Sequence, residues 1–125
     1  CLNREEKGAK AWAYEFARPL PDDGSHPEVT ARLKGAFHSS DLWFVFKSLE
    51  HCWRPWTQGD WDLSEKMLTA WTNFAKYSDP NGEDGKALGW EPCTAEKPQF
   101  MLFKLDDKDA EASEMGDPII PEPAQ

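Results

Sequence analysis

The chain has 125 residues, a length that suits a single domain. It holds 23 acidic and 14 basic residues, a net charge of −9, and no basic stripe, so nucleic acid is excluded as an expected partner. No apolar run is long enough to cross a bilayer and no signal peptide is recognisable, so we expect a soluble protein of unknown compartment without a membrane partner.

The first residue and the cysteines indicate what kind of chain this is. The sequence begins at Cys1 and enters a charged stretch at once, which we interpret as a start inside a longer polypeptide. The three cysteines, Cys1, Cys52 and Cys93, are widely spaced and odd in number, so they do not indicate a disulfide framework. A Cys52–Cys93 bridge is the alternative, but scattered cysteines are more often buried and inert.

A short helix and a strand are predicted first. Residues 4–10 are typical of the end of a helix, with Gly8 as its stop. Residues 11–16 alternate between large apolar residues and small or charged ones, which is the period of a strand. The large residues on one face are Trp12, Tyr14 and Phe16. Small alanines on the second face suit a strand that is covered on both sides, as in an α/β sheet.

A polar region then leads to a histidine loop. Residues 20–34 are rich in turn residues, and we interpret His26 within them as a solvated loop histidine. Residues 35–41 form a short loop whose Gly-Ala pair lets the backbone turn tightly. His38 lies at the tip of this loop, and Asp41 is placed to cap the next helix. A histidine that rigid elements hold on a loop is a frequent general base.

Two helices are predicted after this loop. The first covers about residues 41–49, because four apolar residues fall on one helical face: Leu42, Val45, Phe46 and Leu49. The second covers residues 60–77, with Asp60 as its N-cap and a proline-containing turn at its end. A helix with such an apolar stripe is expected to lie on a sheet.

The segment between the two helices holds an adjacent histidine and cysteine, His51 and Cys52. Zinc sites normally need close pairs of ligands on two arms of the chain, and only one arm is present here. We therefore predict no metal site, and nothing in the sequence indicates a cofactor.

The chain ends in a second strand and an acidic tail. Residues 99–105 are predicted as the strand. Residues 106–125 contain seven acidic residues against one lysine and three prolines, and we expect them to be extended or mobile. Ile119 and Ile120 could dock on a neighbour. The predicted division is thus a folded portion at residues 1–105 and a tail at residues 106–125.

Two strands do not make a self-sufficient sheet, and bare strand edges favour aggregation. The predicted elements therefore describe an α/β fold that is incomplete on its own. The seven tryptophans and seven phenylalanines are expected to lie mainly in the core. Those near His38 are the exception, because aromatic side chains also line small-molecule pockets. The candidates for such a pocket are Phe37, Trp43 and Phe44.

Several segments form a pattern when they are taken in chain order: residues 14–16, 35–42, 63–67, 71–76, 79–82, Trp90 and residues 94–96. The pattern resembles the catalytic-histidine region and the long C-terminal helix of type-B carboxylesterases, the cholinesterase-like branch of the α/β-hydrolase family. It spans about residues 12–105. Each piece is a weak signal, but the whole set in this order is specific.

The resemblance implies the C-terminal part of an α/β-hydrolase fold and a Ser–acid–His triad in that chain order. Only His38 is carried over as catalytic. Asp41 stands where the family often has Glu, and we interpret it as structural. No Gly-x-Ser-x-Gly motif and no Gly-Gly oxyanion loop occur in the sequence. The nucleophile and oxyanion hole are therefore expected upstream, and this chain alone is expected to be inactive.

The resemblance thus predicts the C-terminal fragment of a serine carboxylesterase that supplies the catalytic histidine. Its partners would be a small-molecule ester and the N-terminal portion of the same enzyme or a complementing chain. The alternatives are a catalytically inactive, cholinesterase-like interaction domain and a fragment that assembles with a partner chain. The retained His38 argues against the inactive domain.

Overall fold

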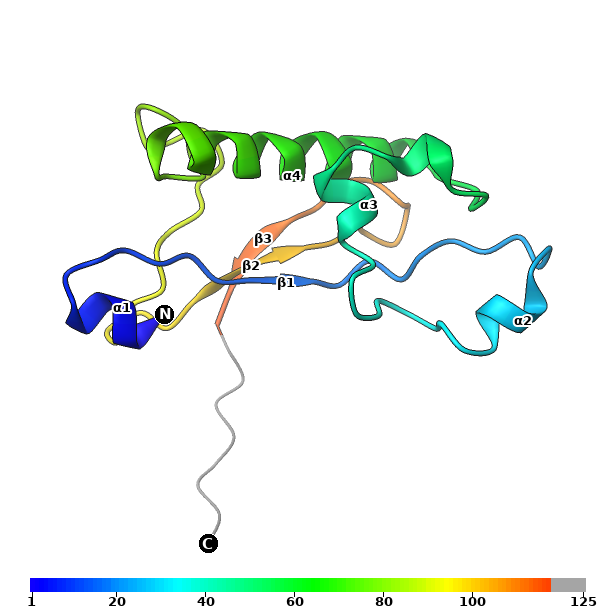
Figure 1. Cartoon of the computed structure of the whole chain (residues 1–125), viewed down its shortest axis with the longest axis horizontal. Helices are drawn as coiled ribbons and strands as arrows, with labels where there is room; N and C mark the ends of the chain where they lie inside the picture. Colours follow the sequence, from blue (N-terminus) through cyan, green and yellow to red (C-terminus); the bar gives the residue numbers. More distant parts are fainter. Residues whose placement is uncertain (118–125) are drawn as a thin grey trace, which may run out of the picture.

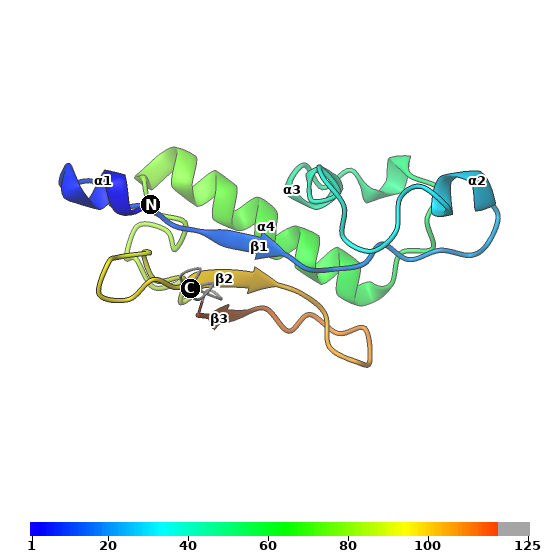
Figure 2. The same cartoon turned by 90° about the horizontal axis from the view of Figure 1, so that it is seen from below.

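A computed structural model describes residues 1–117. Its elements in chain order are α1 (Leu2–Glu6), β1 (Tyr14–Phe16), α2 (Pro27–Thr30), α3 (Leu42–Val45), the 3₁₀-helix η1 (Leu49–His51), α4 (Gln58–Tyr77), β2 (Phe100–Phe103) and β3 (Glu114–Gly116). Helix α4 runs along one face of the sheet (Figure 1), and a view from below shows the strands in front of it (Figure 2). The helix at the start of the chain and the strand before the His38 loop are confirmed.

The sheet has three strands in the order β1-β2-β3. Strand β1 is parallel to β2, with Tyr14 opposite Met101, and β2 is antiparallel to β3, with Phe100 opposite Gly116. A parallel pair covered by a helix is an α/β arrangement, as predicted. Strand β1 lies at the edge of this sheet, with β2 as its neighbour.

Strand β3 was not predicted, because it lies inside the segment interpreted as an acidic tail. Residues 106–117 fold back as a hairpin, with a further bridge between Leu105 and Glu111. Lys104 and Glu114 form an ion pair across it. The division of the chain at residue 105 stays a prediction. The proposed docking of Ile119 and Ile120 lies outside the described residues.

Helix α4 begins earlier than predicted, and Asp60 is not its N-cap. Thr57 is the N-cap, and its hydroxyl accepts the Asp60 N–H. The Asp60 carboxylate accepts the Thr57 N–H at 2.9 Å, which completes a capping box. The N-cap therefore lies three residues before the one that the sequence suggested. The end of the helix is as predicted, because it ends at Tyr77, before the predicted turn.

The helix predicted at residues 41–49 is shorter than expected. Helix α3 ends at Val45, and Lys47 has a left-handed backbone with φ of +50°, which continues no α-helix. The chain then makes the 3₁₀ turn η1. As a result, Val45 and Leu49 are buried as predicted, whereas Leu42 and Phe46 are exposed.

The core lies between α4, α3 and the sheet. Its buried apolar members include Leu20, Phe44, Val45, Leu49, Leu63, Met67, Ala70, Trp90, Met101 and Phe103. The hydroxyl of Ser64, on the buried face of α4, donates to the carbonyl of Phe44 at 2.8 Å and ties α4 to α3. The predicted apolar stripe of α4 faces the core at Leu63 and Met67, whereas Phe74, near the end of the helix, is exposed.

The loop after α4 is fixed by one buried amide. The Asn81 side chain accepts the Trp90 N–H at 2.8 Å and donates to the Trp90 carbonyl at 2.7 Å. The Trp90 indole in turn donates to the carbonyl of Ala13 at 3.1 Å. These bonds join the loop to the start of β1, because buried polar groups need partners.

The three cysteines are unpaired, and none of them is buried. Within residues 1–117, no helix combines the length and the apolar character that a membrane span requires.

Candidate active site

His38 lies on an exposed turn between α2 and α3. The turn is closed by the Ser40 N–H, which donates to the Phe37 carbonyl at 3.0 Å. Gly35 before it has a φ of +67°, as expected for the Gly-Ala pair, and Ser39 has a φ of +66°. A left-handed non-glycine residue next to the candidate base is a local strain of the kind that gathers at functional sites.

Ser40 anchors the turn to the core. It is 1% exposed, and its hydroxyl has no hydrogen-bond partner among residues 1–117. An unpaired buried hydroxyl is costly, and each one in a native structure needs an explanation. Ser40 is thus packed into the core, whereas His38, two residues earlier, is exposed.

Asp41 holds the other end of the turn in a way that the sequence did not indicate. It occupies the N-cap of α3, but its side chain makes no capping bond. Its carboxylate instead accepts a hydrogen bond from the hydroxyl of Tyr14 on β1, at 2.7 Å. Asp41 thus has the predicted N-cap position, but the predicted capping bond was wrong. Its carboxylate is bonded instead to Tyr14, a strand residue distant in sequence. Partial burial and this bond raise the pKa of Tyr14 to about 12.

The raised pKa of Tyr14 predicts a late tyrosine titration. Because the folded pKa lies above the ordinary value of 10.0, the contribution to stability is present below pH 10 and is lost as pH rises towards 12. In a titration followed at 295 nm, Tyr14→Phe should remove a transition near pH 12. Asp41→Asn should leave that transition elevated but lower than in the parent, since burial persists. A Tyr14 transition at its ordinary value would contradict the hydrogen bond.

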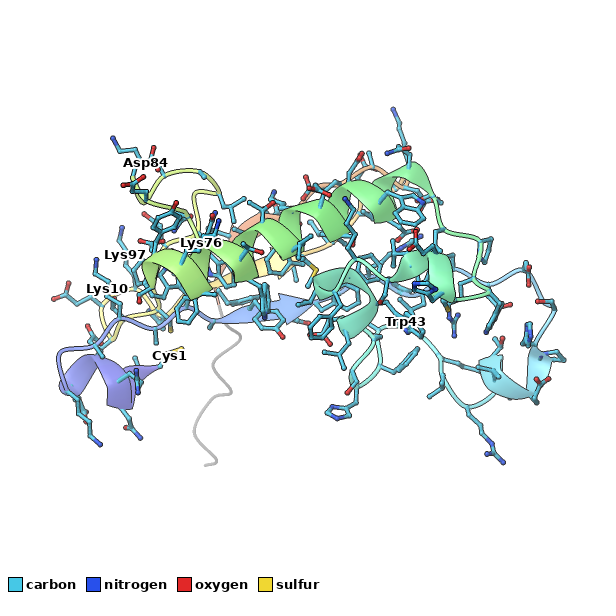
Figure 3. The ribbon with its side chains drawn as sticks, turned by 45° about the horizontal axis from the view of Figure 1, so that its top comes forward. Cys1, Lys10, Trp43, Lys76, Asp84 and Lys97 are labelled. Carbon is cyan, nitrogen blue, oxygen red and sulfur yellow. The ribbon has the colours of Figure 1, made fainter. Side chains whose placement is uncertain are left out.

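The three predicted aromatic pocket residues lie in different environments. Phe37 and Trp43 are half-buried and pack on the core. Phe44 is fully buried, and its ring centroid lies 4.8 Å from that of Phe16 and 5.6 Å from that of Trp56. This burial favours a core role for Phe44 over contact with a ligand. Figure 3 places Trp43 well away from Lys10 and Lys76, which lie toward the end where α4 finishes.

A cavity of about 280 Å³ lies at that end of the molecule. Its walls are mainly aromatic, with two cations, and the residues that line it include Trp12, Tyr14, Trp71, Phe74 and Trp90 with Arg4 and Lys10. Phe37, His38 and Trp43 do not contribute to it. No local sequence pattern indicates this cavity, because its walls come from α1, β1, α4 and the Trp90 loop.

The two other histidines differ from His38. The prediction of a solvated His26 was wrong: it is half-buried and stacks on Trp53, with ring centroids 4.1 Å apart. Its Nδ1 also lies 2.7 Å from the Ser25 hydroxyl. His51 is exposed and lies beside Glu50. Among the described residues, no group of three or more His, Cys, Asp or Glu side chains could hold a metal ion.

What the site can do follows from these positions. An exposed imidazole on a braced turn can accept or donate a proton. Within residues 1–117, no side-chain hydrogen bond links His38 to a serine or a carboxylate. The described residues thus present a candidate base without the other members of a triad.

Comparisons with known proteins give this arrangement a context. The model of the carboxylesterase family matches residues 2–117. The chain is 34% identical over 96 residues to the human bile salt-activated lipase, covering 76% of this chain and 12% of the lipase. A solved PNB esterase superposes with a TM-score of 0.58 at 25% identity, covering 86% of this chain and 19% of that enzyme.

A solved esterase from Clostridium hathewayi has a TM-score of 0.62 at 22% identity, covering 88% of this chain and 19% of that one. At this identity the likeness concerns the fold alone. These structures confirm the predicted fold class, part of an α/β-hydrolase fold. The chain thus spans about an eighth of the lipase and about a fifth of the solved esterases.

Proposed function

The chain belongs to the carboxylesterase family, and on this premise we propose that it is the C-terminal segment of a serine carboxylesterase and supplies the catalytic base, His38. The observation that carries the proposal is the exposed turn between α2 and α3, which presents His38 and is held at Ser40 and Asp41. The resemblance of residues 35–42 to the catalytic-histidine region of the family supports the same role.

In the proposed mechanism, His38 accepts the proton of an upstream serine as the serine attacks an ester carbonyl. His38 then protonates the leaving alcohol and later activates the water that releases the acyl group. A carboxylate, also upstream, would hold the second ring nitrogen and fix the tautomer. Imidazole suits these steps because its ordinary pKa lies near neutral pH.

The proposed substrate contacts are Phe37 and Trp43, with Phe44 behind them. Phe37 directly precedes the base, and both Phe37 and Trp43 keep part of their surface free. Aromatic walls are common in pockets for small apolar ligands. Because Phe44 is fully buried, its contribution to a pocket would be to support the other two rings from the core.

The proposed partner is the remainder of the esterase, as the same polypeptide or as a complementing chain. The edge position of β1 supports this, since its outer side offers unpaired backbone groups to a further strand. The exposed apolar residues Leu42 and Phe46 support it as well. The division of the chain at residue 105, into residues 1–105 and an acidic segment at residues 106–125, is kept as part of this proposal, with β3, inside that segment, paired to β2.

A catalytically inactive, cholinesterase-like interaction domain is the second candidate. It would keep the fold and the exposed surfaces but need no base. The presence of His38 on a strained, exposed turn favours the enzyme.

The test is an assay of p-nitrophenyl acetate hydrolysis by this chain alone and by the complete protein that contains it. We expect turnover by the complete protein and only the uncatalysed rate with the chain alone. Robust hydrolysis by the isolated chain would overturn the upstream position of the nucleophile. A correctly folded complete protein that turns over no ester would favour the interaction domain.

A further inference from the structure

The surroundings of Arg54, which lies between η1 and α4, indicate a candidate ligand site. Its side chain is buried, with 7% of the residue exposed. One guanidinium nitrogen, Nη1, donates to the carbonyl of Pro21 at 3.0 Å. A guanidinium carries five N–H donors and is always charged, so a single neutral acceptor leaves most of its capacity unused.

The groups around Arg54 are mainly aromatic. Its Cζ lies 4.8 Å from the ring centroid of Trp53 and 5.9 Å from that of Phe37. Aromatic faces stabilise a cation but accept no hydrogen bond in the plane of the guanidinium. The two rings therefore flank the guanidinium but provide no acceptor for its N–H groups.

No carboxylate of residues 1–117 lies within 4.0 Å of the guanidinium. The charge of Arg54 acts electrostatically on Asp22. The exposed Asp22 carboxylate accepts hydrogen bonds from the Thr30 hydroxyl and the Gly24 N–H. The pKa of Asp22 is lowered chiefly by these two bonds, with a smaller contribution from Arg54. The charge of Arg54 thus lacks a direct counterion within the described residues.

The half-buried Arg18 has the opposite surroundings. Arg18 donates to both oxygens of Asp60, at 2.8 and 3.1 Å, and to Asp109 at 3.0 Å. Arginine and carboxylate typically meet in this forked geometry. A buried charge without such a partner is unfavourable.

The Nε and Nη2 groups of Arg54 donate no hydrogen bond within the described residues. Within residues 1–117, the Ser40 hydroxyl is the only fully enclosed side-chain polar atom without a partner. The remaining Arg54 nitrogens therefore keep contact with solvent. Among the described residues, these nitrogens have no side-chain hydrogen-bond partner that an anion would have to displace.

We propose that Arg54, with Phe37 and Trp53 as walls, is the anchor of a binding site for a small-molecule carboxylate. The forked guanidinium matches the two oxygens of a carboxylate. Because Phe37 is the residue before His38, the bound anion would lie beside the His38 turn. The site goes beyond the proposed esterase activity and does not depend on it.

The test titrates the full chain with sodium acetate at constant ionic strength, with acetamide as the uncharged control. Tryptophan fluorescence and the Nε–H resonance of Arg54 report binding. We expect a saturable change with acetate and none with acetamide. Arg54→Lys, which keeps the charge but loses the fork, should weaken binding about 10-fold or more. Arg32→Met, at an exposed arginine, should leave binding unchanged.

Three results would overturn the proposal. One is a linear, unsaturable response to acetate in the unmodified chain. Another is equal acetate affinity in a folded Arg54→Lys variant, as judged by circular dichroism. The third is acetate binding by the isolated chain that disappears in the complete protein, because this would show that a carboxylate of the polypeptide fills the site.

Discussion

Replacing His38 with alanine in a complete esterase that contains this segment is expected to lower kcat/KM for p-nitrophenyl acetate by about 10²–10⁴-fold, the usual worth of a general acid–base group. The loss should be mainly in kcat, because the imidazole moves a proton only as the ester bond is attacked. Unfolding should be unaffected, since the side chain is exposed on its turn.

The chain supplies two matched controls for this experiment, His26 and His51. His26→Ala removes a histidine that stacks on Trp53, and His51→Ala removes one that is exposed. Neither should change kcat by more than about twofold, because neither lies on the His38 turn. Full activity in a folded His38→Ala protein would contradict the assignment of the base. Equal losses in all three variants would point to a general effect on folding.

The sequence predicted the parts of this site that depend on local chemistry. A Gly-Ala pair indicated a tight turn, and Gly35 has the left-handed backbone that such a turn needs. Alternating aromatic residues indicated β1, and helical spacing indicated α4, whose predicted apolar face is buried at Leu63 and Met67. These signals work because each depends on residues close in sequence.

The partners of the site could not be predicted, because they are distant in sequence. The pairing of Asp41 with Tyr14 joins residues 27 apart, so the local capping rule for Asp41 failed. His26 was misread because its stacking partner, Trp53, comes from the segment before α4. A local pattern predicts the structure of a short segment, whereas these contacts join segments that only the folded chain brings together.

Strand β3 was missed for a related reason. Its three residues, Glu114 to Gly116, carry no alternating apolar pattern and lie in an acidic stretch. The strand is held by pairing with β2, and the hairpin that leads to it is held by an ion pair of Glu111 with Lys66 of α4, at 3.0 Å. The tip of this hairpin passes so close to α4 that a Cβ at Gly59 would lie 1.8 Å from the Asp109 carbonyl oxygen. Only glycine fits there.

The start of α4 is where the largest effect on stability is expected. Replacing Asp60 with alanine should lower the free energy of unfolding by about 3–5 kcal/mol, the cost of removing one partner of a buried ion pair. Asp60 is fully buried and receives two bonds from Arg18 and one from the Thr57 N–H. Alanine would leave the half-buried Arg18 with only the exposed Asp109 as a partner and would also remove the capping box.

Urea unfolding followed by circular dichroism measures this change, and Asp62→Ala is the matched control. Asp62 lies on the exposed side of the same helix and accepts a bond from Gln58, so its loss should cost about 0.5 kcal/mol or less. Asp60→Asn keeps the shape but removes the charge, and its cost should fall between the two. If Arg18→Met restores stability to the Asp60→Ala chain, the unpaired cation is the cause; if it does not, the capping box accounts for the loss.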